Sequence, residues 1–157
     1  MKRFCLALTL ALVAAACAPP AAAPPEPLRF SILSSESQAV QSRDWGPLLA
    51  DLSEAVGRPV EPTFGSNYTV LIEAMRFGRS QMGWFGNASA IEAVDRAEGE
   101  VFAAAIRADR VAGYRGVMIV AATGGPTLDA VLACDRSLDF GAADAQSTSG
   151  TLAPIAT

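Results

Sequence analysis

Short apolar runs alternate with segments of helical period along most of this 157-residue chain, and this alternation limits its fold more than any other feature. The first apolar run, residues 29–33, is followed by a helical pattern that includes Trp45 and stops at Gly57. Apolar runs of this kind are typical of strands, and the helical segments between them would connect neighbouring parallel strands. The pattern therefore predicts an α/β fold in layers, with a mostly parallel sheet.

The pattern also gives the order of the expected elements. The expected strands cover 29–33, 59–64, 81–86, 101–106, 116–122 and the residues around 138–141. The expected helices end at Gly57, Gly78 and Ala97, and a short one covers 128–133. Pro59 and Pro62 each remove a backbone donor from the second strand, which is therefore expected at an edge of the sheet, outside the first. Ser66 or Asn67 can cap the second helix.

The first 27 residues are not expected to belong to the fold. A cationic start precedes an apolar run, so residues 1–16 have the build of a secretory signal peptide. Cys17 follows three small residues, which resembles the cleavage site of a bacterial lipoprotein, although Ala14 stands where such sites usually carry leucine. Lipid attachment at Cys17 and ordinary cleavage after the alanines therefore both remain open. After Cys17, the rest of segment 17–27 holds five of the ten prolines and forms a stiff tether.

Composition excludes several classes of function. The chain contains no histidine, so no Ser/His/Asp or Cys/His nucleophile system and no His-ligated metal can be built from these residues. The formal net charge of -4 argues against nucleic-acid binding, which usually needs a basic face. Glu92 and Arg96 have the spacing of an i,i+4 surface pair, and no metal site or cofactor is expected. Cys134 has no partner in the exported part and is expected to be a small buried residue.

Three polar loops each follow an expected strand and precede an expected helix or the chain's last segment: 34–38, 86–89 and 146–150. The carboxyl ends of parallel strands face one crevice, where ligands of open α/β sheets bind. A helix that begins at Ser147, Thr148 and Ser149 would offer unpaired N–H groups and hydroxyls to an anion. Simpler interpretations also exist, because a serine-rich loop is often solvated with a local cap and Tyr68 can be a core residue.

Several short stretches occur in one characteristic order between about residue 29 and Pro154. They are SESQ at 35–38, MRF at 75–77, WFGNASA at 84–90, EAVDRA at 92–97, Gly113-Tyr114 and STSG at 147–150. Together they resemble the phosphonate-binding (PhnD-type) solute-binding proteins of ABC transporters. The resemblance implies a periplasmic-binding-protein type II fold with two lobes. Residues 28–122 would form most of the first lobe and 123–157 an incomplete second lobe, since the family continues well beyond this point.

The resemblance also implies which residues bind the ligand. The phosphonate oxygens would be held by the hydroxyls of Ser147, Thr148 and Ser149 and by the helix that starts there. Two tyrosines of the first lobe, Tyr68 and Tyr114, would also reach the ligand. Ser35, Gly86 and Asn87 would line the same crevice at the ends of the first and third strands. Phe85 stands where relatives can carry tyrosine, which removes one possible hydroxyl donor.

The function implied by the resemblance is that of an extracytoplasmic solute-binding component of an ABC importer. The ligand would be a phosphonate or a related phosphorus oxyanion such as phosphate or phosphite. The protein would bind it without chemistry, as a monomer, and deliver it to a membrane permease. Two alternatives stay open: an exported enzyme that acts on phosphoesters, and a ligand-sensing module for a signalling partner. The enzyme has little support, because histidine is absent and Lys2 is the sole lysine.

Overall fold

A computed structural model of the chain describes residues 24–106, 108, 113 and 116–156. The expected signal peptide, Cys17 and Tyr114 lie outside the described residues. The described part contains a parallel sheet with the strand order β2-β1-β3. Its strands are β1 (Leu28–Leu33), β2 (Val60–Gly65) and β3 (Met82–Gly83). The expected α/β class with a parallel sheet is therefore confirmed.

β1 is the central strand and β2 lies at an edge of this sheet, as the prolines predict. β1 pairs with β2 over its whole length, from Leu28 opposite Val60 to Leu33 opposite Gly65. Pro62 stands inside β2, opposite Phe30. An edge strand tolerates this residue because one of its two sides needs no ladder donors.

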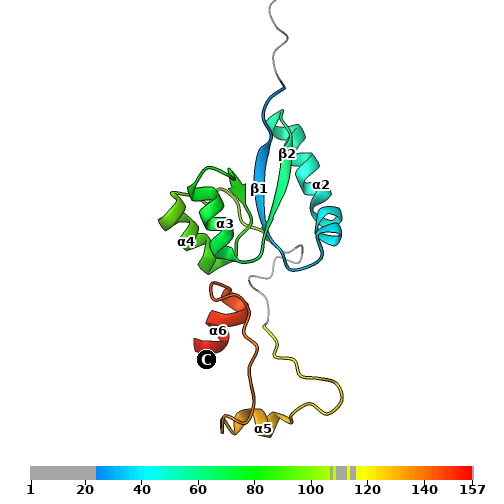
Figure 1. The fold of residues 1–157 in the computed structure, drawn as a ribbon, viewed down its shortest axis with the longest axis vertical. Coiled ribbons are helices and arrows are strands. Elements are labelled where there is room, and N and C mark those ends of the chain that lie inside the picture. Colours follow the sequence, from blue (N-terminus) through cyan, green and yellow to red (C-terminus); the bar gives the residue numbers. More distant parts are fainter. Residues whose placement is uncertain (1–23, 107, 109–112, 114–115, 157) are drawn as a thin grey trace, which may run out of the picture.

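Three helices surround the sheet: α2 (Gln38–Val56), α3 (Tyr68–Arg76) and α4 (Asn87–Ala97). α2 lies on one side of the strands, and α3 and α4 lie on the other (Figure 1). Local signals fix their ends. The side chain of Ser37 accepts a hydrogen bond from the amide of Val40, and Asn67 accepts one from Val70 in the same way. α2 ends at Gly57, whose φ of 69° lies in the left-handed region that glycine adopts without strain.

The core lies mainly between β1 and α2. Its buried members are Phe30, Ile32, Leu49 and Val60, with Leu28, Trp45, Leu52, Phe64 and Met82 packed around them. The ring of Trp45 bridges Phe30 and Trp84, with centroids 6.0 Å and 5.3 Å away. On the other side of the sheet, Leu71 and Ile72 of α3 are buried. α3 also contacts β1 and β3, and α4 packs on α3, so this helix pair lies against the strands whose carboxyl-end loops carry Ser35 and Gly86.

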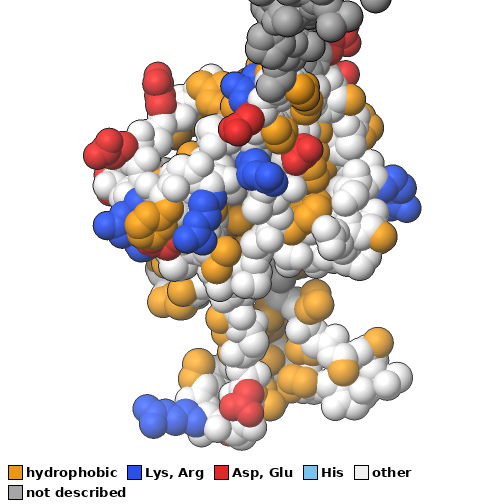
Figure 2. Space-filling view, turned by 45° about the horizontal axis from the view of Figure 1, so that its top comes forward, with side chains coloured by type: hydrophobic (Ala, Val, Ile, Leu, Met, Phe, Trp, Pro, Cys, Tyr) orange, Lys and Arg blue, Asp and Glu red, His pale blue; other side chains and the backbone are white. Residues whose placement is uncertain are grey.

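The later strands predicted from the sequence do not form in the described structure. Residues 101–106, 116–122 and 138–141 contain no strand, and the third strand is limited to Met82–Gly83. The apolar side chains of these runs are exposed, for example Ile106 at 80% and Ile119 at 85%. Figure 2 shows such hydrophobic side chains over the lower part of the molecule. The predictions were wrong because an apolar run becomes a strand only where a neighbouring strand pairs with its backbone.

Three short helical elements follow: α5 (Leu128–Leu132), the π-helix η1 (Thr148–Leu152) and α6 (Ala153–Ala156). α5 matches the short helix expected from the sequence, and its cap is the side chain of Thr127. Cys134 was expected to be buried, but it is exposed and free. It follows α5 with a φ of 49°. The residues around it, 132–141, are all exposed, so this stretch adds no side chain to the core. The segment before η1 runs back to the first turns of α3 and α4 (Figure 1).

Candidate ligand-binding site

Gly86, the residue before α4, has three hydroxyl groups around its α-carbon. A Cβ atom built there would lie 3.4 Å from the hydroxyl of Tyr68, 3.6 Å from that of Ser89 and 3.9 Å from that of Thr148. These hydroxyls come from α3, α4 and η1, so three separate elements meet at one point. Because Gly86 has no side chain, the three oxygen atoms have room between them for a group about the size of a methyl. These three hydroxyls mark the candidate ligand-binding site.

Tyr68 is the first residue of α3, directly after the cap Asn67. Its ring packs against that of Phe85, with centroids 6.3 Å apart, and its side chain is half-buried. Its hydroxyl nevertheless lies beside Gly86. The packing interpretation and the ligand interpretation of Tyr68 are therefore compatible, because the ring packs while the oxygen faces the open space.

Thr148 is held by the first turn of α4. The amide of Ala88 donates a hydrogen bond of 3.0 Å to its hydroxyl oxygen. The first N–H groups of a helix have no partner within the helix and carry a partial positive charge. A hydroxyl that accepts from such an amide still has its own proton to donate. Thr148 can therefore accept a hydrogen bond from the first turn of α4 and at the same time donate one to an anion beside Gly86.

Ser147 is the N-cap of η1, and its hydroxyl oxygen accepts from the amide of Gly150 at 3.2 Å. The local-cap interpretation of this serine is thus correct, although its proton remains available to another acceptor. Ser149 lies within η1, with its carbonyl oxygen close to Gly116. Asn87 is the first residue of α4, directly after Gly86. The structure therefore brings Tyr68, Gly86 and Thr148 into one cluster, and Ser147, Ser149 and Asn87 adjoin it in sequence.

Ser35 follows β1, and β1 and β3 are parallel neighbours, so Ser35 and Gly86 extend from the same edge of the sheet. No described hydrogen bond joins Ser35 to Tyr68, Gly86 or Thr148. Its partner is Gln41, whose amide nitrogen donates to the carbonyl of Leu33 at 2.6 Å and to the Ser35 hydroxyl at 3.4 Å. Gln41 is only 4% exposed. Its side chain ties α2 to the end of β1 and to Ser35, and no sequence motif marked it.

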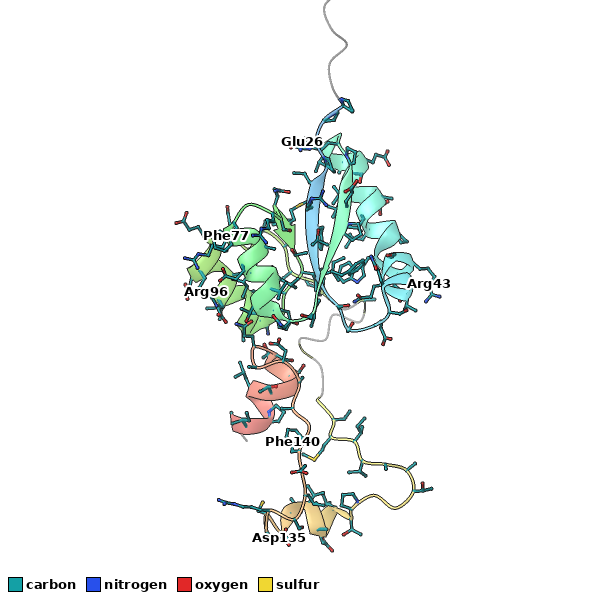
Figure 3. All side chains as sticks on the ribbon, viewed as in Figure 1. Glu26, Arg43, Phe77, Arg96, Asp135 and Phe140 are labelled. Carbon is teal, nitrogen blue, oxygen red and sulfur yellow. The ribbon has the colours of Figure 1, made fainter. Side chains whose placement is uncertain are left out.

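A charged cluster links α3, α4 and the segment before η1. Arg96 pairs with Glu92 at 2.6 Å, as its i,i+4 spacing predicts, and also with Glu73 on α3. Figure 3 shows Arg96 on the outer side of these helices. The hydrogen bond with Glu92, together with the charge of Glu73, raises the pKa of Arg96. Glu92 also accepts from the side chain of Gln146, so its carboxylate is used in structural contacts.

Ser89 and Asp144 are further polar residues that the sequence motifs did not single out as ligand contacts. Ser89 is fully buried and donates to the carbonyl of Gly86 at 3.1 Å. Asp144 accepts from the amide of Tyr68 at 3.2 Å. Ser89 lies in the polar loop 86–89, which was a signal for it, whereas Asp144 has no sequence signal because its partner is distant. Among the described residues, no group of His, Cys, Asp and Glu side chains could hold a metal ion.

Three comparisons place this chain among known proteins. A family model described as "ABC transporter, phosphonate, periplasmic substrate-binding protein" matches residues 30–157. The phosphonates-binding periplasmic protein of Escherichia coli (strain K12) is 42% identical over 128 residues, or 81% of this chain and 38% of that protein. The crystal structure of a binding protein component of an ABC phosphonate transporter from Pseudomonas aeruginosa matches with a TM-score of 0.72 at 38% identity. This match covers 82% of this chain and 43% of that one, so the chain spans less than half the length of both relatives.

Proposed function

Because the chain belongs to the family of phosphonate-specific periplasmic substrate-binding proteins of ABC transporters, we propose that it captures a phosphonate or a related phosphorus oxyanion for import. Phosphate and phosphite are the related ligands. The observation that carries the proposal is the group of three hydroxyls around Gly86, next to the first turn of α4. Neutral donors and a helix start are a known chemical solution for binding phosphate groups.

In this proposal, the oxygens of the ligand lie beside Gly86. Tyr68 donates a hydrogen bond from α3 and Thr148 donates one from η1. Ser147 and Ser149 add donors from the same turn as Thr148. Hydrogen bonds to a charged acceptor are about twice as strong as neutral ones, so a few hydroxyls suffice without a lysine. Ser35, Asn87 and Tyr114 are proposed to complete the lining: Ser35 from the end of β1, Asn87 from the start of α4, and Tyr114 on the family resemblance alone.

The proposed role is binding and delivery to a membrane permease, with no chemistry on the ligand. The family model and the Pseudomonas aeruginosa structure are both described as binding proteins of ABC transporters, which supports this role over that of a phosphoester enzyme. We further propose that residues 1–16 are a signal peptide and that Cys17 carries lipid, with 18–27 as the tether of an extracytoplasmic monomer. Residues 28–122 are proposed as the first lobe and 123–157 as part of the second. Among the described helices, none has both the length and the apolar character that crossing a bilayer requires.

Titration calorimetry on the full chain tests the proposal. Methylphosphonate, aminoethylphosphonate, phosphite and phosphate are titrated separately, with sulfate as a control oxyanion. We expect saturable binding to at least one phosphorus compound and weaker binding to sulfate. Absence of binding to all four phosphorus compounds would contradict the proposed function. Release of phosphate from a phosphate ester would instead support the enzyme alternative.

A further inference from the structure

Segment 144–148 is attached to α3 and α4 by side-chain hydrogen bonds. The amide of Tyr68 donates to Asp144, the side chain of Gln146 donates to Glu92, and the amide of Ala88 donates to Thr148. The partners are 76, 54 and 60 residues apart in sequence. These bonds are therefore tertiary contacts, and they decide where the segment lies.

Asp144 makes one of these three bonds, and its carboxylate also has a second partner within the segment. One oxygen accepts from the amide of Gln146 at 2.8 Å and closes a turn, and the other accepts from Tyr68 at 3.2 Å. The backbone carbonyl of Asp144 also accepts from the amide of Ser147 at 2.8 Å. One residue thus shapes the backbone directly before Ser147 and fixes it against α3.

The position of the carboxylate is electrostatically favourable. The amide of Tyr68 belongs to the first turn of α3, where N–H groups lack partners in the helix and a negative charge is stabilised. The Asp144 carboxylate accepts a hydrogen bond from this amide. The hydroxyl of Tyr68, at the far end of the tyrosine side chain, lies beside Gly86. The two ends of Tyr68 therefore serve different partners.

We infer that Asp144 is a positioning residue, which holds segment 147–149 against α3 and α4 so that Thr148 and Tyr68 lie together beside Gly86. The inference rests on the proposed function of that site. Asp144 itself does not contact the ligand in this arrangement. It orders the segment before the ligand arrives, so that less conformational entropy is lost on binding.

Calorimetry with methylphosphonate on the full chain tests this role. Asp144→Ala removes both side-chain hydrogen bonds and weakens binding by about threefold or more. Asp144→Asn keeps an oxygen that can accept one of the two bonds, so its affinity lies between those of the wild type and the alanine variant. The matched control is Asp135→Ala. Asp135 closes the same kind of turn, accepting from the amide of Ser137 at 2.8 Å, but lies beside α5, away from α3 and α4 (Figure 3).

The direction of the effect separates positioning from charge. If Asp144 acted only as a negative charge near the anion, both of its variants would bind methylphosphonate more tightly than the wild type. Tighter binding, unchanged binding or a loss below about threefold in Asp144→Ala overturns the inference. A loss of the same size in Asp135→Ala also overturns it, because the effect would not depend on contact with α3.

Amide hydrogen exchange without ligand gives a second readout, independent of the proposed function. Exchange at the amides of Tyr68 and Ala88 is expected to be faster in Asp144→Ala than in the wild type and in Asp135→Ala. Unchanged exchange at these amides overturns the inference. If the wild type binds none of the phosphorus compounds, the proposed function fails and exchange alone decides the role of Asp144. If Asp144→Ala does not fold, exchange in Asp144→Asn decides it by the same criterion.

Discussion

The absence of a side chain at Gly86 leaves room between the three hydroxyls, and an alanine at this position would fill that room with little strain. Its φ of -76° is open to any residue, and an added Cβ would lie no closer than 3.4 Å to its neighbours. We expect Gly86→Ala to weaken binding of the phosphorus ligand about tenfold or more, because the methyl group takes the place of a ligand oxygen. Its unfolding free energy should fall by at most about 1 kcal/mol, since alanine is a poorer N-cap than glycine.

The control for Gly86→Ala is Gly141→Ala, where an added Cβ would meet nothing within 4 Å. Calorimetry and thermal melting on both variants check the prediction. If Gly86→Ala binds its ligand as tightly as the wild type, the open space beside Gly86 is not where the ligand lies.

Tyr68 offers a second test at this scale, because one oxygen atom separates its two roles. Tyr68→Phe keeps the ring that packs against Phe85 and removes the hydroxyl beside Gly86. We expect affinity to fall about tenfold or more, as for a lost hydrogen bond to a charged group, with little change in the melting temperature of the ligand-free protein. A lower melting temperature with unchanged affinity would instead show that Tyr68 serves packing alone.

The amino-terminal end of α3 supplies one of the site residues, because Tyr68 is the first residue of this helix. Asn67 caps it through a hydrogen bond of 2.9 Å from the amide of Val70. Asn67→Ala should lower the unfolding free energy by about 1 kcal/mol, which chemical denaturation measures. Asn67→Asp keeps an acceptor and adds a negative charge at the helix start, so it should retain the stability of the wild type. Equal losses in both variants would contradict the capping role.

The helices could be predicted from the sequence because their signals are local. Gly57 and Asn67 mark the ends of α2 and α3 within the chain itself, and Pro62 marks β2 as an edge strand. The run 116–122 has equally clear strand composition, yet it forms no strand in the described structure. Whether a run pairs depends on a distant neighbour, and composition carries no information about that neighbour.

The same distinction applies to the candidate site. Gly86 and Thr148 could be named because they belong to short motifs with a recognisable order. Tyr68 could be named because the family resemblance implies a ligand tyrosine at its position. Gln41 and Asp144 could not, because what they do depends on contacts with distant parts of the chain or on burial. A sequence motif thus identifies groups that can face a ligand, but not the residues that hold those groups in place.

At the scale of the whole molecule, stability is concentrated in the part built around β1. Ile32 is 1% exposed in the core, whereas Ile119 is 85% exposed. In this chain, Ile32→Ala should lower the unfolding free energy by about 2–5 kcal/mol through the lost burial and the cavity it leaves. Ile119→Ala should change it by less than about 0.5 kcal/mol. Chemical denaturation of the two variants is the measurement, and similar losses would show that segment 116–122 is packed in solution.

The direction of β1 sets the height of the site above any surface to which the chain is attached. The tether enters the sheet at the amino end of β1, and Ser35 and the Gly86 cluster lie beyond the carboxyl ends of the strands (Figure 1). Six residues of strand span about 20 Å. In a chain anchored at Cys17, as proposed above, the ten tether residues add a reach of up to about 35 Å. The Gly86 cluster would then lie on the side of the domain that faces away from the bilayer, about 20 Å beyond the point where the tether joins β1.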